Sequence, residues 1–153
     1  MDYYQGSLRQ FAEELLSTGK GNGMMVEIAS VNELVIEDAM KKGLKFHSMT
    51  IVVTQNTIFK YANHPKEKKG AVVPVSKYDL IEKALKTPLH IYEDPIQHEI
   101  IYVYTDPYDE SKLIKVEVHP NYTLKRGVFI NSAKSWGIVV GEAFYNSQYR
   151  MIK

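Results

Sequence analysis

In Leu113-Ile114-Lys115-Val116-Glu117-Val118-His119, apolar side chains alternate with charged or polar ones. Successive side chains of a β-strand point to opposite faces, so this alternation predicts a strand with one face in a core and the other in water. Further β-rich runs surround it, and turn-forming pairs such as Asp106-Pro107 separate them. Consecutive short strands with tight turns predict an antiparallel meander of four strands, over residues 89–92, 99–105, 112–119 and 127–131.

The first half of the chain has helical periodicity instead. Apolar residues spaced three and four apart predict helices over residues 6–18, 31–40, 55–64 and 77–86. Two short apolar runs at 24–28 and 49–53 predict short strands. Helices first and strands afterwards predict an α+β fold, with N-terminal helices packed on a four-stranded antiparallel sheet. We expect a helical extension over residues 1–45, an α+β domain over 46–140, and a C-terminal tail over 141–153 that can form a helix.

The composition limits the class of protein. The 153 residues, of which 44% are hydrophobic and 24% charged, fit one globular domain and argue against disorder or a coiled coil. The absence of cysteine excludes disulfides, thiolate nucleophiles and cysteine-based zinc sites. No apolar run approaches the ~18–20 residues of a membrane span, and the N-terminus has no signal-like apolar stretch. We therefore expect a cytoplasmic location and no membrane partner.

The net charge of +1 hides an uneven distribution along the chain. Residues 1–40 carry seven acidic and two basic side chains, whereas residues 41–86 carry ten lysines and only three acidic residues. A lysine-rich centre can form a cationic face for a polyanion such as RNA. It can equally be a solvated surface, and the charge pattern alone does not separate these alternatives.

Lys60 and His64 are the most suggestive pair for chemistry. Four residues apart on one predicted helix, they project from the same face. A lysine can neutralise a phosphate while a neighbouring imidazole transfers a proton near neutral pH. The alternative is that they form the ordinary polar face of an amphipathic helix whose Ile58 and Phe59 point inward.

The other aromatic and polar groups are less specific. The remaining histidines lack the spacing of metal ligands, so we expect no metal site and no cofactor. Tyr102 and Tyr104 share one face of a predicted strand, where they can stack on bases or pack within a sheet. Residues 131–135 end the last predicted strand with small hydroxyls and Lys134, which suits phosphate binding or an ordinary turn.

The order of these features resembles a known family. Thr50-Ile51-Val52-Val53-Thr54 is followed by Lys60, then by Asn63-His64-Pro65, by a helix ending at Pro88, and by strands ending at Ser132. Over residues 49–135 this arrangement is similar to the phage branch of the barnase/EndoU/colicin/RelE-like nuclease superfamily. The resemblance implies a metal-independent RNA endonuclease of the toxin or effector type, which cleaves by attack of the 2′-hydroxyl on the adjacent phosphate.

Carried over residue by residue, the resemblance makes Lys60, His64 and Ser132 the catalytic residues. His64 is the acid or base, while Lys60 and Ser132 stabilise the charge of the phosphorane. Lys66, Lys68, Lys69 and Lys134 are the expected nucleic-acid-binding residues, and RNA is the expected partner. For a phage-encoded chain the location is the host cytoplasm, where a host or antitoxin protein is a further expected partner.

Two other functions stay open at this point. One is a phage or mobile-element protein that keeps a nuclease-like fold without catalysis and binds a host defence factor or nucleic acid. The other is an accessory protein of phage structure or assembly. Cleavage of RNA in EDTA separates the enzyme from both of these alternatives.

Overall fold

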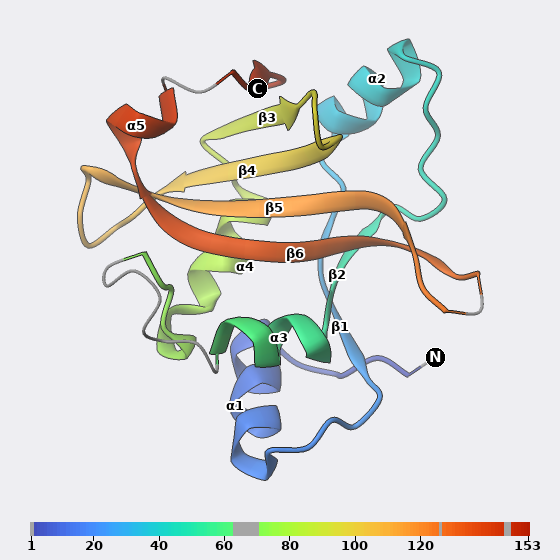
Figure 1. Ribbon diagram of the computed structural model, residues 1–153, viewed down its shortest axis with the longest axis vertical. Coiled ribbons are helices and arrows are strands. Elements are labelled where there is room, and N and C mark those ends of the chain that lie inside the picture. Colours follow the sequence, from blue (N-terminus) through green and yellow to red (C-terminus); the bar gives the residue numbers. More distant parts are fainter. Residues whose placement is uncertain (1, 63–70, 126, 146–147) are drawn as a thin grey trace.

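The computed structural model describes residues 2–62, 71–125, 127–145 and 148–153 (Figure 1). The helices are α1 (Leu8–Thr18), α2 (Glu33–Lys41), α3 (Gln55–Ala62), the 3₁₀ turn η1 (Val75–Lys77), α4 (Asp79–Lys86) and α5 (Gly141–Tyr145). The strands are β1 (Met25–Ser30), β2 (Thr50–Thr54), β3 (His90–Asp94), β4 (Glu99–Thr105), β5 (Lys112–Thr123), β6 (Phe129–Val140) and β7 (Arg150–Met151). No helix among the described residues has both the length and the apolar character needed to cross a membrane.

The strands form one mixed sheet in the order β1-β2-β6-β5-β4-β3-β7. The α+β class is confirmed, but the prediction of a four-stranded antiparallel sheet is wrong. The expected antiparallel meander exists as β3 to β6, and β1 and β2 extend it through a parallel pairing of β2 with β6. Local periodicity shows that a segment is a strand but not which distant strand it pairs with, so the pattern missed this contact between Ile51 and Asn131.

Local signals explain where α1 begins and ends. The Ser7 side chain accepts a hydrogen bond from the backbone N–H of Gln10, and the Gln10 side chain accepts one from Ser7, which completes a capping box. Gly19 ends the helix in the left-handed conformation, at φ 68°. The carboxylate of Glu82 on α4 accepts the Leu8 N–H at 2.6 Å, so α1 is tied to α4 at its first turn.

The main core lies on one face of the sheet. Fully buried side chains of α1, α3 and α4 pack there against Ile51, Val53, Ile114 and Val116. In Figure 1 α4 lies behind β5 and β6, and the front of the central strands carries no helix among the described residues. We call this front the open face. At one end of it, Phe144 of α5 packs against Tyr92 and Leu113.

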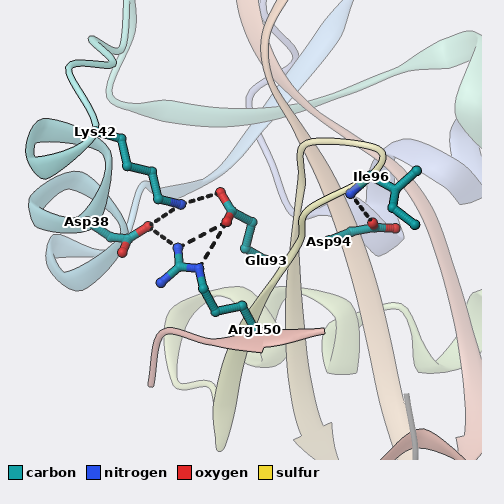
Figure 2. A network of polar contacts seen from close by, with 6 residues as sticks. All are labelled: Asp38, Lys42, Glu93, Asp94, Ile96 and Arg150. Atoms are coloured by element: carbon teal, nitrogen blue, oxygen red, sulfur yellow. Dashed lines mark hydrogen bonds and ion pairs between the residues drawn. The ribbon is translucent and has the colours of Figure 1, made fainter. Parts of the chain in front are cut away.

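A charge network joins α2 and β7 to strand β3 of the sheet (Figure 2). Arg150 of β7 contacts Asp38 of α2 at 2.6 Å and Glu93 of β3 at 3.1 Å. Lys42 completes the network, at 2.6 Å from Glu93 and 3.1 Å from Asp38. Strands β1 and β7 belong to the same sheet as the central segment, although they come from the expected extension 1–45 and tail 141–153.

Candidate functional site

A hollow of about 390 Å³ lies where α3 meets the open face. We call it the Lys60 hollow; its lining residues are Asn56, Thr57, Lys60, Tyr61, Glu117, Lys134 and Ser135. The arrangement follows from chain order, because α3 begins directly after β2 and so lies beside the part of β6 that β2 does not reach (Figure 1). The fully buried Ile58 anchors α3 in the main core, while Lys60 is exposed.

A β-bulge directs the polar side chains of β6 into this hollow. Glu117 pairs with Ser135 and Val118 pairs with Ala133, so Lys134 is an extra residue on β6. A bulge lets two consecutive side chains reach one face of a sheet. Here the two side chains are those of Lys134 and Ser135. Lys134 forms an ion pair with Glu99 of β4, and the Ser135 hydroxyl donates to Glu117 at 2.9 Å.

The two carboxyl groups beside the hollow have pKa values shifted in opposite directions. Burial raises the pKa of Glu99, which is only 5% exposed, and the neighbouring Glu117 adds to the rise against the opposing effect of Lys134. Burial alone would raise the pKa of Glu117 too, but hydrogen bonds from Lys115, at 2.8 Å, and from Ser135 lower it. Opposite pKa shifts in two neighbouring acids are typical of acid–base sites. The acid with the lowered pKa is ionised and can accept a proton, and the acid with the raised pKa keeps its proton to a higher pH.

The hollow contains two cationic groups. The hydrogen bond to Glu99 raises the pKa of Lys134, which keeps this lysine charged. Lys60 makes no salt bridge within the described part of the chain, and its ammonium nitrogen lies 5.4 Å from the centre of the Tyr61 ring. The cationic side chains can bind a phosphate, and the ionised carboxylate beside them can accept a proton from a group next to that phosphate.

The predicted site residues are found in three situations. Lys60 and Lys134, which come from distant segments, line the same hollow. Ser132 is only 5% exposed and lies in β6 beside Val52, away from the hollow lining. His64, Lys66, Lys68 and Lys69 lie outside the described residues.

The other expectations from the sequence can also be placed. Of the lysine-rich centre, Lys60 lines the hollow, whereas Lys77 lies over the Tyr108 ring and Lys86 pairs with Glu82 on α4. Tyr102 is 1% exposed and packs in the core, and burial raises its pKa to about 12. The described ranges contain no group of three His, Asp or Glu side chains arranged to hold a metal.

Sequence reasoning missed Glu117, Glu99 and Ser135. The alternating pattern of residues 113–119 does place Glu117 on the wet face of its strand. Its neighbours depend on the register of β4, β5 and β6 and on the bulge, which local periodicity does not encode. A search for carboxylates at wet positions of the meander would have found Glu117 as one of several candidates.

Comparison with known proteins adds no further constraint on this site. No family model, no curated protein and no solved structure matches the chain.

Proposed function

We propose that the chain is a metal-independent RNA endonuclease that cleaves by 2′-hydroxyl transesterification in the Lys60 hollow. One observation carries the proposal. The hollow places the carboxylate of Glu117, whose pKa is lowered, together with the cationic side chains of Lys60 and Lys134. These are the groups that the reaction needs for proton removal and for the charge on phosphorus.

Each step of the reaction has a candidate group. Glu117 accepts the proton of the 2′-hydroxyl, and the 2′-oxygen forms a bond to the adjacent phosphorus. The bond from phosphorus to the 5′-oxygen breaks, which leaves a 2′,3′-cyclic phosphate and a 5′-oxygen that takes up a proton. The resemblance makes His64 an acid or base, and with Glu117 as the base we assign this last transfer to His64. A positioned group contributes typically 10²–10⁴-fold for each such proton transfer.

The remaining groups act on charge and orientation. Lys60 and Lys134 stabilise the additional negative charge of the pentacoordinate phosphorus. Ser135 and Lys115 hold Glu117 in place through the hydrogen bonds that keep it ionised. The geometry therefore favours Ser135 as the hydroxyl next to the reacting groups, whereas the resemblance names Ser132.

The test is cleavage of total RNA by the purified chain in EDTA. We expect fragments with cyclic phosphate ends, and we expect Lys60→Ala, His64→Ala and Glu117→Gln each to lose most of the rate. Lys112→Gln, on the same strand but outside the hollow lining, is the matched control and keeps the wild-type rate. Wild-type cleavage by Glu117→Gln would remove this carboxylate from the mechanism.

A second candidate function is binding without cleavage. It is favoured by the burial of Ser132, because the hydroxyl that the resemblance assigns to catalysis does not line the hollow. Such a protein retains RNA in a salt-sensitive manner and releases it intact. Retention without fragments in the experiment above would select this function.

A further inference from the structure

A second hollow adjoins the Lys60 hollow. It measures about 880 Å³, and its lining includes Met25, Gln55, Asn56, Tyr122, Leu124 and Lys125. Asn56 lines both hollows, so the two lie next to each other beside α3. An extended ligand in the Lys60 hollow can therefore reach this second one, which we call the Tyr122 hollow.

The Tyr122 ring lies on the open face of the sheet. Tyr122 pairs with Ile130 across β5 and β6, and Ile130 packs with Met25 and Val52. Val52 lies between Ile51 and Val53, which face the main core, so this cluster is on the opposite side. Tyr122 is 44% exposed, and it shares the lining of the hollow with the apolar residues Met25 and Leu124.

His119 connects the Tyr122 ring to the charged groups of the first hollow. The two rings are nearly perpendicular, with centres 5.4 Å apart. Burial lowers the pKa of His119, and the positive charge of Lys134 lowers it further, so both effects favour the neutral imidazole. The open face thus has a row from Lys134 through His119 to an exposed aromatic ring.

Amide groups also line the Tyr122 hollow. The side-chain oxygen of Gln55 accepts the backbone N–H groups of Asn22 at 2.8 Å and Gly23 at 3.0 Å. This holds the Gln55 amide at the start of α3, next to Asn56. A fixed amide in the same hollow as an exposed ring suits a nucleobase, which stacks through its face and forms hydrogen bonds through its edge.

We infer that the Tyr122 hollow binds the base of a nucleotide next to the phosphate held by Lys60 and Lys134. The ligand is single-stranded nucleic acid, with one base stacked on Tyr122 and its edge toward Gln55 and Asn56. Lys125, which also lines this hollow, adds a cation for the neighbouring backbone phosphate. This inference rests on the RNA substrate of the proposed function and not on the cleavage step.

The test uses an uncleavable probe, a fluorescent hexadeoxynucleotide, in EDTA at low salt. We expect Tyr122→Ala to bind about 5- to 150-fold more weakly, the loss typical of one stacked base. Tyr122→Phe keeps the stacking face and binds as the wild type does. Tyr108→Ala removes a tyrosine that is 74% exposed and outside both hollows, and it leaves the affinity unchanged.

A probe with one abasic nucleotide makes the test specific. When the missing base is the one that stacks on Tyr122, the wild type binds the abasic probe more weakly than the intact probe. Tyr122→Ala binds the two probes with equal affinity. Equal affinity of Tyr122→Ala and wild type, equal losses in Tyr122→Ala and Tyr108→Ala, or no binding of the probe would each overturn the inference. The probe lacks 2′-hydroxyls and cannot be cleaved, so its binding is measured independently of cleavage. Absence of RNA cleavage would therefore defeat the proposed endonuclease without affecting the result for base binding.

Discussion

Glu117 lies between Lys115 and Ser135, and these two donors lower its pKa. We expect RNA cleavage to persist down to a pH below the ordinary glutamate range of ~4.3, because the base stays ionised there. Lys115→Ala removes the nearer donor, so the acid limb of the pH–rate profile moves to higher pH. Initial rates over a pH series measure this shift, with Lys112→Ala as the control. An acid limb that stays in place in Lys115→Ala would contradict the role of Glu117.

The two serines of β6 give the next prediction. The Ser135 hydroxyl donates to Glu117, whereas Ser132 is buried beside Val52. We therefore expect Ser135→Ala to lower the cleavage rate and Ser132→Ala to leave it near wild type, since removing the hydroxyl of Ser132 takes nothing from the lining of the hollow. Parallel rate measurements on the two variants decide between them. A loss confined to Ser132→Ala would support the assignment taken from the resemblance.

Helix α3 positions the site through one buried side chain. Ile58 is fully buried in the main core, so Ile58→Ala should lower the free energy of unfolding by about 2–5 kcal/mol. Lys60 is exposed two residues later, and Lys60→Ala should change stability by less than about 0.5 kcal/mol while it removes cleavage. Urea unfolding of both variants measures the contrast. Comparable destabilisation by Lys60→Ala would show a structural role for this lysine.

The charge network of Arg150 makes the stability of the whole molecule depend on pH. The hydrogen bond from Arg150 lowers the pKa of Asp38. Burial acts to raise the pKa of Glu93, but hydrogen bonds from Lys42 and Arg150 outweigh it, so this pKa is lowered as well. Because these folded-state pKa values lie below the unfolded ones, the stabilisation is complete above the unfolded values and is lost as the pH falls through the folded values. We expect Arg150→Ala to cost about 1 kcal/mol at pH ~7 and little at pH ~2.

Unfolding by urea at the two pH values tests this expectation. Arg9→Ala is the matched control, because Arg9 pairs with Asp79 at the surface, where both side chains are more than 40% exposed. Such a pair contributes about 0–1 kcal/mol, so this variant should stay closer to wild type at both pH values. An Arg150→Ala deficit that is the same at pH ~2 would mean that the network stabilises by packing rather than by charge.

Much of the local structure was determined by the sequence alone. Helical spacing predicted α1, and alternation predicted β5 with one face in the core. The same spacing predicted that Ile58 points into the core and that Lys60 lies on the polar face of its helix. These features depend on residues within a few positions of one another, where backbone geometry and burial leave a recognisable pattern.

Only the tertiary structure decided the sheet order and the composition of the Lys60 hollow. The parallel pairing of β2 with β6 joins segments about 80 residues apart, and the bulge at Lys134 turns two adjacent side chains to one face. Pairing and register are chosen by the burial of whole strands in a common core, which no local window of sequence contains. For this reason Lys60 could be singled out from the sequence, whereas its neighbours Glu117 and Ser135 could not.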